Sequence, residues 1–352
     1  MSLIDLTSLT FEEMRPLILE LGLPSYRAEQ IWDWVRRGAT DFDEMSNLSK
    51  DLRMKLKEKF QICNIKLEKR LVSQLDDTVK YLYQLHDGEY IESVVMHYHH
   101  GYSICISTQA GCRMGCSFCA TGKEGFARNL TAGEMLSQIT EAQRDRNIRI
   151  SNVVLMGMGE PLDNYDNVLR FLRLVSAENG LAIGMRHISL STCGIVPRIY
   201  DLAKENLQLT LSVSLHAPTN DLRSEMMPIN RKWDVDELLK ACRYYADVTG
   251  RRISYEYALV SGVNDSLQHA AQLAAKLKGT LCHVNLIPVN PVDGTGYHES
   301  ARAQIFAFQK ELQKHQINAT VRRTLGADIK ASCGQLRQGK KRGETQHHAN
   351  RE

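Results

Sequence analysis

The chain has 352 residues, of which 43% are hydrophobic, and its formal net charge is +3. Such a chain can bury a sizeable core, and its length predicts one large domain with a smaller one. The weak positive charge permits a polyanionic partner but excludes a dedicated nucleic-acid coat protein, which would carry a larger excess of lysine and arginine. The N-terminal residues lack a signal-peptide pattern and the sequence has no run of 18 apolar residues, so we expect a cytoplasmic protein with no membrane segment.

Residues 1–75 are predicted to form a small helical domain with a linker. Residues 25–38 and 48–60 each place apolar side chains along a helical stripe. The second segment also carries five cations that could bind phosphates, although a solvated helix face is the more common role of such a run. These cations are Lys50, Arg53, Lys55, Lys57 and Lys59.

Residues 76–340 are predicted to form the core domain, which begins with a β-hairpin. Residues 78–98 alternate apolar and polar side chains around a break at His86-Asp87-Gly88. Strand-like and helical segments then alternate, as in parallel βαβ units. The expected strands cover residues 103–107, 152–157, 187–192, 207–217, 252–259, 282–288 and 318–323. This α/β pattern predicts a full or partial (β/α) barrel, and the polar residues 341–352 are predicted to be a disordered tail.

Motif-like segments follow the predicted strands, where a β/α barrel places its chemistry. A cysteine-rich loop follows the first strand, and further motifs follow later strands. They are residues 157–161 (GMGEP), 191–194 (STCG), 214–218 (SLHAP) and 288–291 (PVNP). Two of the intervening helices are expected to begin with a capping box, at Thr131 and at Asp234.

The cysteine loop reads QAGCRMGCSFCATG and contains Cys112, Cys116 and Cys119. The chain has nine cysteines and is too long to need disulfide staples, so clustered thiols point to a metal or to catalysis. Zinc would suit Cys116 and Cys119 but would need a second close ligand pair, which the other cysteines do not supply. The nearby histidines of the HYHH segment fit the polar end of a strand more simply. We therefore interpret the three thiols as ligands of an iron-sulfur cluster rather than as a zinc site or buried thiols.

Three thiolates leave one iron of a four-iron cluster without a protein ligand, as expected of a catalytic rather than a structural centre. A Cys-x3-Cys-x2-Cys loop after the first barrel strand resembles the signature of the radical S-adenosylmethionine (SAM) superfamily. This resemblance implies a barrel of the radical-SAM type and one 4Fe-4S cluster held by three cysteines. It also implies that the open iron binds the amino and carboxylate groups of SAM, which is then cleaved to a 5′-deoxyadenosyl radical.

Six motifs in order, from CISTQAGCRMGCSFCATG to DIKASCGQLR, resemble the RlmN/Cfr family of RNA adenine methyltransferases. The resemblance extends from about residue 10 to residue 338. It implies that Gly159 and Glu160 hold the methionine end of SAM. The other SAM contacts implied by the family are Ser191, Ser214, Leu215, His216 and Asn290. Without the cysteine loop, turn formation and strand capping would be the simpler interpretation of these residues.

The family resemblance also implies tasks for two distant cysteines. Taken alone, Cys105 would be a small buried hydrophobe and Cys333 a loop thiol. The adenine carbon between two nitrogens is electron-poor and does not attack a sulfonium methyl group, so direct displacement is excluded. The family route has Cys333 take a methyl group from one SAM molecule, and a radical from a second SAM then activates it for addition to adenine. Cys105 next attacks the sulfur of Cys333, which leaves methyladenosine and a disulfide.

Glu92 matches the position of the base that removes the ring proton in this route. An alternative interpretation is a solvent-facing carboxylate on an alternating strand. Lys330 departs from the family pattern, in which an acidic residue is more usual, and it lies in the segment that carries Cys333. The departure concerns the local contacts of that segment rather than the thiol.

The implied substrates are adenosines of 23S rRNA, at the peptidyl transferase centre, and of the tRNA anticodon loop. The target base must leave its stack, which favours RNA not yet folded into the ribosome. Pro161 favours methylation of C2, and C8 methylation of the same rRNA adenosine, as in the resistance branch, is the alternative. The resemblance further implies an electron donor such as flavodoxin, a thiol reductant for the disulfide of Cys105 and Cys333, and a monomer.

Two rival functions fit parts of the sequence. A non-enzymatic iron-sulfur RNA-binding protein would need the cluster but neither Cys105 nor Cys333. Another radical enzyme, such as a methylthiotransferase, would need a second cluster motif, which the sequence does not contain.

Overall fold

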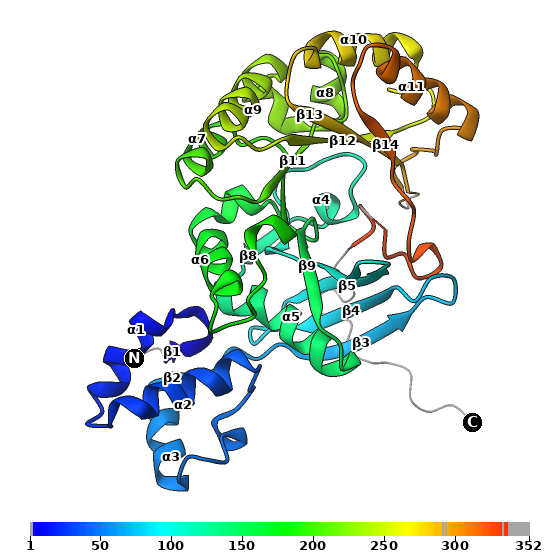
Figure 1. Ribbon diagram of the computed structural model, residues 1–352. Helices are drawn as coiled ribbons and strands as arrows, with labels where there is room; N and C mark the ends of the chain where they lie inside the picture. The colour runs from blue at the N-terminus through cyan, green and yellow to red at the C-terminus, as the bar shows by residue number, and fades with distance from the viewer. Residues whose placement is uncertain (1–2, 291, 293, 333, 337–352) are drawn as a thin grey trace, which may run out of the picture.

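A ten-stranded mixed sheet forms the core of this computed structural model, which describes residues 3–290, 292, 294–332 and 334–336 (Figure 1). The strand order is β14-β13-β12-β11-β10-β9-β6-β5-β4-β3. All neighbours from β6 to β14 pair in parallel, whereas β3, β4 and β5 continue the sheet as an antiparallel meander. The bounds are β3 Lys66–Val72, β4 Val79–Gln84, β5 Tyr90–Tyr98, β6 Gly101–Cys105, β9 Ile150–Leu155, β10 Ile188–Thr192, β11 Thr210–Ser214, β12 Ile253–Leu259, β13 Cys282–Pro288 and β14 Ala319–Val321.

The seven strands predicted for the core domain are all present, and helices separate most of them. The helices lie outside the curved sheet (Figure 1). They are α5 Ala132–Arg146, α6 Tyr165–Ser176, α7 Val196–Lys204, α8 Asn220–Met226, α9 Val235–Thr249, α10 Leu267–Leu277 and α11 Arg302–Lys314. The predicted capping boxes at Thr131 and Asp234 are confirmed, because each side chain accepts a hydrogen bond from the glutamate amide three residues later.

The barrel is partial rather than closed. Strands β14 and β3 stand at the two ends of the strand order, and no pairing joins them within the described residues. The prediction of a radical-SAM-type (β/α) barrel, full or partial, is therefore confirmed in its partial form. No helix in this part of the chain is both long and apolar enough to cross a membrane.

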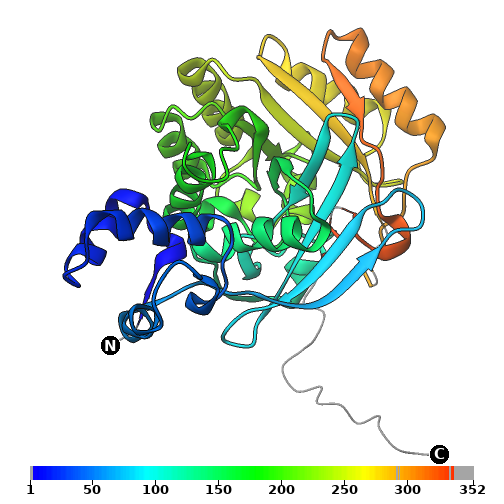
Figure 2. The ribbon, with the colours of Figure 1, turned by 60° about the horizontal axis from the view of Figure 1, so that its bottom comes forward.

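The N-terminal region contains three helices, α1 Phe11–Leu19, α2 Ser25–Arg36 and α3 Lys50–Lys59. Two short parallel strands, β1 Ile4–Asp5 and β2 Phe60–Gln61, close it. Its helices lie on the opposite side of the molecule from α11 and β14 (Figure 2).

The predicted phosphate-binding run on α3 is largely engaged within the protein. Lys57 pairs with Asp41 and Asp43 at 2.8 and 2.7 Å. Lys55 donates to the carbonyl of Leu21 and Arg53 to that of Asp43. Three of the five cations therefore already have partners within the protein and are less available to bind phosphates. This favours the alternative interpretation, an ordinary helix face in contact with solvent, for much of the run.

Strand β3 was not expected from the sequence. It lies within residues 1–75, the range predicted as helical domain with linker, yet it pairs with β4 over its whole length. Its sequence, KLEKRLV, has polar side chains on both faces, and none of its residues is buried. An edge strand with so little buried surface gives no clear alternating pattern, which explains why it was missed.

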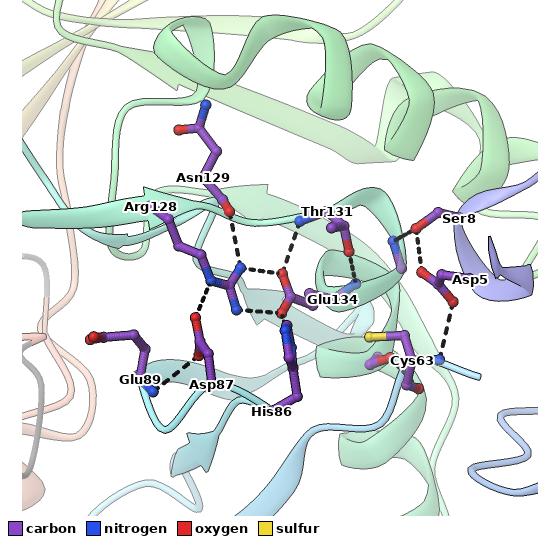
Figure 3. Close-up of polar contacts among 12 residues, drawn as sticks. Asp5, Ser8, Cys63, His86, Asp87, Glu89, Arg128, Asn129, Thr131 and Glu134 are labelled. Carbon is purple, nitrogen blue, oxygen red and sulfur yellow. Dashed lines mark hydrogen bonds and ion pairs between the residues drawn. The ribbon is translucent and has the colours of Figure 1, made fainter. Parts of the chain in front are cut away.

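A polar network joins the N-terminal region, the hairpin and the end of the cysteine loop (Figure 3). Arg128, on strand β8 Phe126–Asn129, contacts both carboxylate oxygens of Glu134 at 2.7 and 2.8 Å and also pairs with Asp87 of the hairpin turn. At the start of the same helix α5, the hydroxyl of Ser8 accepts a hydrogen bond from the amide of Gly133 and donates one to the carboxylate of Asp5. These contacts fix three separate segments around the first turn of α5.

Candidate active site

A cavity of about 980 Å³, open to solvent, lies at the carboxyl ends of the parallel strands. Most of the predicted site residues line it. They are Cys112, Cys116, Cys119, Gly159, Glu160, Ser191, Ser214, His216 and Asn290. Leu215 is the exception among the predicted SAM contacts, because its side chain is fully buried and is not part of the cavity wall. The strand ends thus bring together segments that are far apart in the sequence.

The cysteine loop is folded back by a short hairpin. Strand β7, Gln109–Gly111, pairs with β8, and the amide of Cys112 donates to the carbonyl of Gly125 at 2.7 Å. Gly111 has a φ of +78°, and a Cβ there would lie 2.1 Å from that same carbonyl oxygen. Only glycine allows this close approach, so Gly111 determines where the first thiol enters the cavity.

The three thiols fit an iron-sulfur cluster by the chemistry of their surroundings. Burial raises the pKa of Cys112 to about 12 and that of Cys116 further, and the other thiols and Glu160 add to both shifts. Such thiols ionise only when a cation favours the thiolate, as iron would. Within the described residues, no three His, Cys, Asp or Glu side chains converge closely enough to hold a single metal ion. Three cysteines that line one cavity could each bind a different iron of a polynuclear cluster.

Glu160 is held rigidly in the cavity wall. It is 3% exposed, and its two carboxylate oxygens accept from the amides of Leu162 at 3.0 Å and Cys193 at 2.7 Å. Burial raises the pKa of Glu160, and these hydrogen bonds oppose the shift. A buried carboxylate that already has two amide donors is well oriented to pair with an ammonium group.

Gly159 is needed for packing as well as for its backbone conformation. Its φ is +101°, and a Cβ would lie 2.5 Å from the Cβ of Gln109. The side chain of Gln109 in turn accepts from the amide of Glu160 at 2.9 Å. Gly159 therefore lets the strand-end loop after β9 lie directly against the start of the cysteine loop.

His216 has a left-handed backbone conformation, with φ at +56°, which is unusual for a residue other than glycine. Its Nδ1 accepts a hydrogen bond from the amide of Ala258 at 2.8 Å, and its ring packs edge-on against Phe118. Burial, together with the charge of Arg223, lowers the pKa of His216 to about 3. The imidazole is therefore neutral, and the loop after β11 is fixed in one conformation.

A second cavity of about 560 Å³ adjoins the first and contains Cys105. Cys105 is 8% exposed, so the prediction of a buried position is confirmed. The two cavities share four wall residues, which are Met156, Ile287, Asn290 and Arg322. Cys333 lies outside the described residues, but its neighbours Ser332 and Gly334 line the second and the first cavity, respectively.

The segment before Cys333 is anchored to the β3–β4 turn. The carboxylate of Asp328 accepts from the hydroxyl of Ser73 at 2.7 Å and from the amide of Gln74 at 2.9 Å. Lys80 donates from Nζ to the carbonyl of Lys330 at 3.1 Å. Lys330, where an acidic residue is more usual, thus contributes its main chain to this anchor.

Glu92 is buried, at 5% exposure, so the alternative of a solvent-facing carboxylate is wrong. Its carboxylate lies 3.2 Å from Nζ of Lys80, which is also buried. Val94 pairs with Cys105 across β5 and β6, and Glu92 lies on the same face of β5 as Val94 because side chains alternate along a strand. Glu92 and Cys105 therefore share one face of the sheet, although Glu92 lines neither cavity.

Comparison with known proteins agrees with this site. Residues 106–274 match the Radical SAM superfamily, and residues 4–62 match the ribosomal RNA large subunit methyltransferase N-terminal domain. The "Probable dual-specificity RNA methyltransferase RlmN" of Alkaliphilus oremlandii is 54% identical over 96% of this chain and 98% of its own length. The chain belongs to the RlmN family. The protein of the same name from Clostridium novyi is 52% identical over 95% of the chain and 97% of its own length.

This RlmN-family chain is a radical SAM RNA methyltransferase. A crystal structure of a radical SAM methyltransferase from Sphaerobacter thermophilus is 43% identical and matches with a TM-score of 0.91, over 95% of this chain and 99% of the other. Membership excludes the two rivals considered above, a non-enzymatic iron-sulfur protein and a methylthiotransferase. The superfamily implies a 4Fe-4S cluster and SAM as cofactors.

Sequence reasoning missed two groups that organise the RlmN-family site. Asn264 is fully buried and donates to the carbonyl of His216 at 2.7 Å while accepting from the amide of Val260. Arg223 is also fully buried beneath the cavity. Neither residue stands in a motif, and arginine is rarely buried, so no local sequence pattern signalled the burial of Arg223.

Proposed function

We propose that this enzyme methylates C2 of an adenosine in 23S rRNA and of an adenosine in the tRNA anticodon loop. The observation that carries the proposal is the pair of adjoining cavities, one lined by three cysteines and the other containing Cys105. Ser332 lines the second cavity and Gly334 the first, which supports a thiol carrier at residue 333 that serves both. Pro161 supports C2, and C8 methylation of the rRNA adenosine remains the alternative.

Cys112, Cys116 and Cys119 would hold one 4Fe-4S cluster, and the cluster with SAM would supply a 5′-deoxyadenosyl radical. Glu160 would pair with the ammonium group of SAM. Ser191, Ser214 and Asn290 offer hydrogen bonds to its polar groups. Gly159, Leu215 and the neutral His216 would shape the wall, with Leu215 acting through its main chain. Two SAM molecules would be used per turnover.

Cys333 would carry the methyl group as S-methylcysteine to the adenine. The radical adduct must lose one electron, which can return to the cluster, and its ring proton. Cys105 would then attack the sulfur of Cys333, so that the carbon-sulfur bond breaks, a disulfide forms and the released carbon takes up a proton to become the methyl group. Glu92 would accept the ring proton, and its carboxylate is held in place 3.2 Å from Nζ of Lys80. The buried position of Glu92 supports a chemical role, because an unneeded carboxylate on a strand would face solvent.

Residues 1–75 would form the accessory domain with its linker, residues 76–340 the catalytic core and residues 341–352 a tail. The match of residues 4–62 to an rRNA methyltransferase domain supports a role in RNA binding for the accessory domain, residues 1–75. We further propose a cytoplasmic monomer that takes electrons from a donor such as flavodoxin. A thiol reductant would restore Cys105 and Cys333 after each turnover.

The covalent route is tested with Cys105→Ala protein, reduced anaerobically with SAM and RNA. A protein-RNA crosslink should accumulate, since the thiol that releases the product is missing. Cys333→Ala is the matched control and should give no crosslink. If Cys105→Ala instead released methylated RNA without a crosslink, the roles of both cysteines would be wrong.

The position of methylation is tested by mass spectrometry of digested RNA from wild-type reactions. We expect 2-methyladenosine from both rRNA and tRNA. Formation of 8-methyladenosine would overturn the C2 assignment while leaving the covalent route intact. Product from only one RNA would contradict the dual specificity.

A further inference from the structure

Arg223 is a fully buried arginine on α8 with only neutral hydrogen-bond partners among the described residues. Its Nε donates to the carbonyl of Leu215 at 3.1 Å, and Nη2 donates to the carbonyls of Cys193 at 2.7 Å and Ser214 at 3.1 Å. Nη1 donates to Oδ1 of Asn230 at 3.1 Å. No carboxylate of this part of the chain forms an ion pair with it.

The position of Arg223 connects three segments of the cofactor cavity. Its guanidinium binds the loops after β10 and β11. The next turn of the same helix binds the cysteine loop, because the carbonyl of Met226 accepts from the amide of Ser117 at 2.9 Å. The charge is therefore fixed directly beneath the cavity wall.

A buried charge without a counter-charge is unfavourable, and proteins usually pair it. Burial lowers the pKa of Arg223, and the groups that oppose this shift are the thiols of Cys193, Cys116 and Cys242. Cys116 is one of the three cysteines assigned to the cluster. The negative charge that Arg223 lacks within the protein would thus be present once the cysteines are ionised and bound to iron.

We propose that Arg223 is the buried counter-charge of the iron-sulfur centre and raises its reduction potential. The inference rests on the three-cysteine cluster of the proposed function. Reduction adds one negative charge to the cluster, and a fixed positive charge nearby stabilises the product of that step more than the reactant. Arg223 is a positioning and electrostatic residue, and it does not touch the reacting atoms.

The test is an anaerobic redox titration of reconstituted protein, with the reduced cluster followed by electron paramagnetic resonance. One unit charge acting over about 10 Å through an effective dielectric of about 20 changes such an equilibrium by roughly tenfold. Arg223→Met should therefore lower the reduced-to-oxidised ratio at the wild-type midpoint by about tenfold, or about 59 mV for one electron. Arg223→Lys keeps the charge but loses the planar fork, so it should shift the potential by less than half as much.

Arg36→Met is the matched control. Arg36 is also a buried arginine that donates to main-chain carbonyls, those of Thr7 and Leu9, but it lies on α2, outside the cavity. Its replacement should reduce stability and leave the potential unchanged. An Arg223→Met protein with the wild-type potential would overturn the proposal. So would Arg223→Lys shifting the potential as far as Arg223→Met, because the effect would then be purely structural.

Asn230→Asp provides a second test in which Arg223 is retained, in case Arg223→Met fails to fold. It places a carboxylate at the position that now accepts from Nη1, although it loses the amide donations to Asn220 and Ser224. The resulting ion pair should lower the potential, as Arg223→Met does. An unchanged potential in folded Asn230→Asp protein would overturn the proposal. Wild-type protein that forms no cluster would instead contradict the proposed function.

Discussion

Replacement of Glu160 by glutamine tests the cofactor cavity most directly. The change keeps the size of the side chain but removes the charge that would pair with the ammonium group of SAM. A hydrogen bond to a charged group contributes about 1.5–3 kcal/mol. We therefore expect the Kd for SAM to rise by about 10- to 150-fold.

The structure predicts a second effect of Glu160→Gln, on stability. Both carboxylate oxygens accept main-chain amides, from Leu162 and from Cys193. The amide nitrogen of glutamine must face one of these N–H groups, which leaves a buried donor unsatisfied. Such a group costs about 1–3 kcal/mol, so the free energy of unfolding should fall by that amount.

Equilibrium dialysis with labelled SAM on anaerobically reconstituted protein measures the affinity, and urea unfolding measures the stability. Glu134→Gln is the control, since Glu134 is equally buried but pairs with Arg128 outside the cavity. It should lose stability and keep its SAM affinity. A Kd within threefold of wild type for Glu160→Gln, or an equal loss for Glu134→Gln, would refute the assignment.

The same carboxylate predicts a pH dependence of SAM binding. Burial raises the pKa of Glu160 above its ordinary value of 4.5. SAM binds the ionised form, so its affinity should fall as the pH decreases through this raised pKa, beginning above pH 4.5. The Glu160→Gln protein should lack this transition. Dialysis across this range, on wild type and variant, checks the prediction.

Three further predictions concern the elements around the cavity. Gly111→Ala should prevent iron incorporation, which is measured as the iron-to-protein ratio. Gly262→Ala is the control and should keep its iron, because Gly262 also has a positive φ but has open space around it. Burial lowers the pKa of His216 to about 3 in the folded state, below the ordinary value of 6.5 in the unfolded state. Because the unfolded chain binds the proton first, the free energy of unfolding should fall as the pH drops from 6.5 towards 3. The expected slope is up to about 1.4 kcal/mol per pH unit. His216→Asn, which tolerates the same backbone, should lack that slope in urea titrations. Lys80→Met removes the buried partner of Glu92 and should cost about 3 kcal/mol in the same assay, and a loss below 0.5 kcal/mol would contradict the pairing.

The parallel strands could be predicted from the sequence because they are short apolar runs, and most of them are followed by a motif. Once those runs are placed in one barrel, the strand ends must meet, which is why Cys112, Glu160 and His216 were expected together. The capping boxes could also be predicted from the sequence, because their two residues lie three positions apart. These features depend on local sequence and on one topological rule.

The contacts that could not be predicted are those between distant segments. The pairing of Glu92 with Lys80 had no signal in the sequence, because the register between β4 and β5 determines it. Arg223 looks like an exposed helical residue until α8 packs under two strand ends. The role of Leu215 depends in the same way on tertiary packing, because its main-chain carbonyl accepts from Arg223. Such roles follow from tertiary packing and have no local signature.

The open barrel leaves two sheet edges in the described part of the chain, and open edges invite pairing with other chains. Strand β14 limits this risk by being only three residues long. Strand β3 is longer, but it carries Lys66, Lys69 and Arg70 and has a bulge after Leu67. The polar sequence of β3, which prevented its prediction as a strand, thus also disfavours edge-to-edge aggregation. Replacing these charges with apolar residues would be expected to promote fibre-like association without altering the cavity.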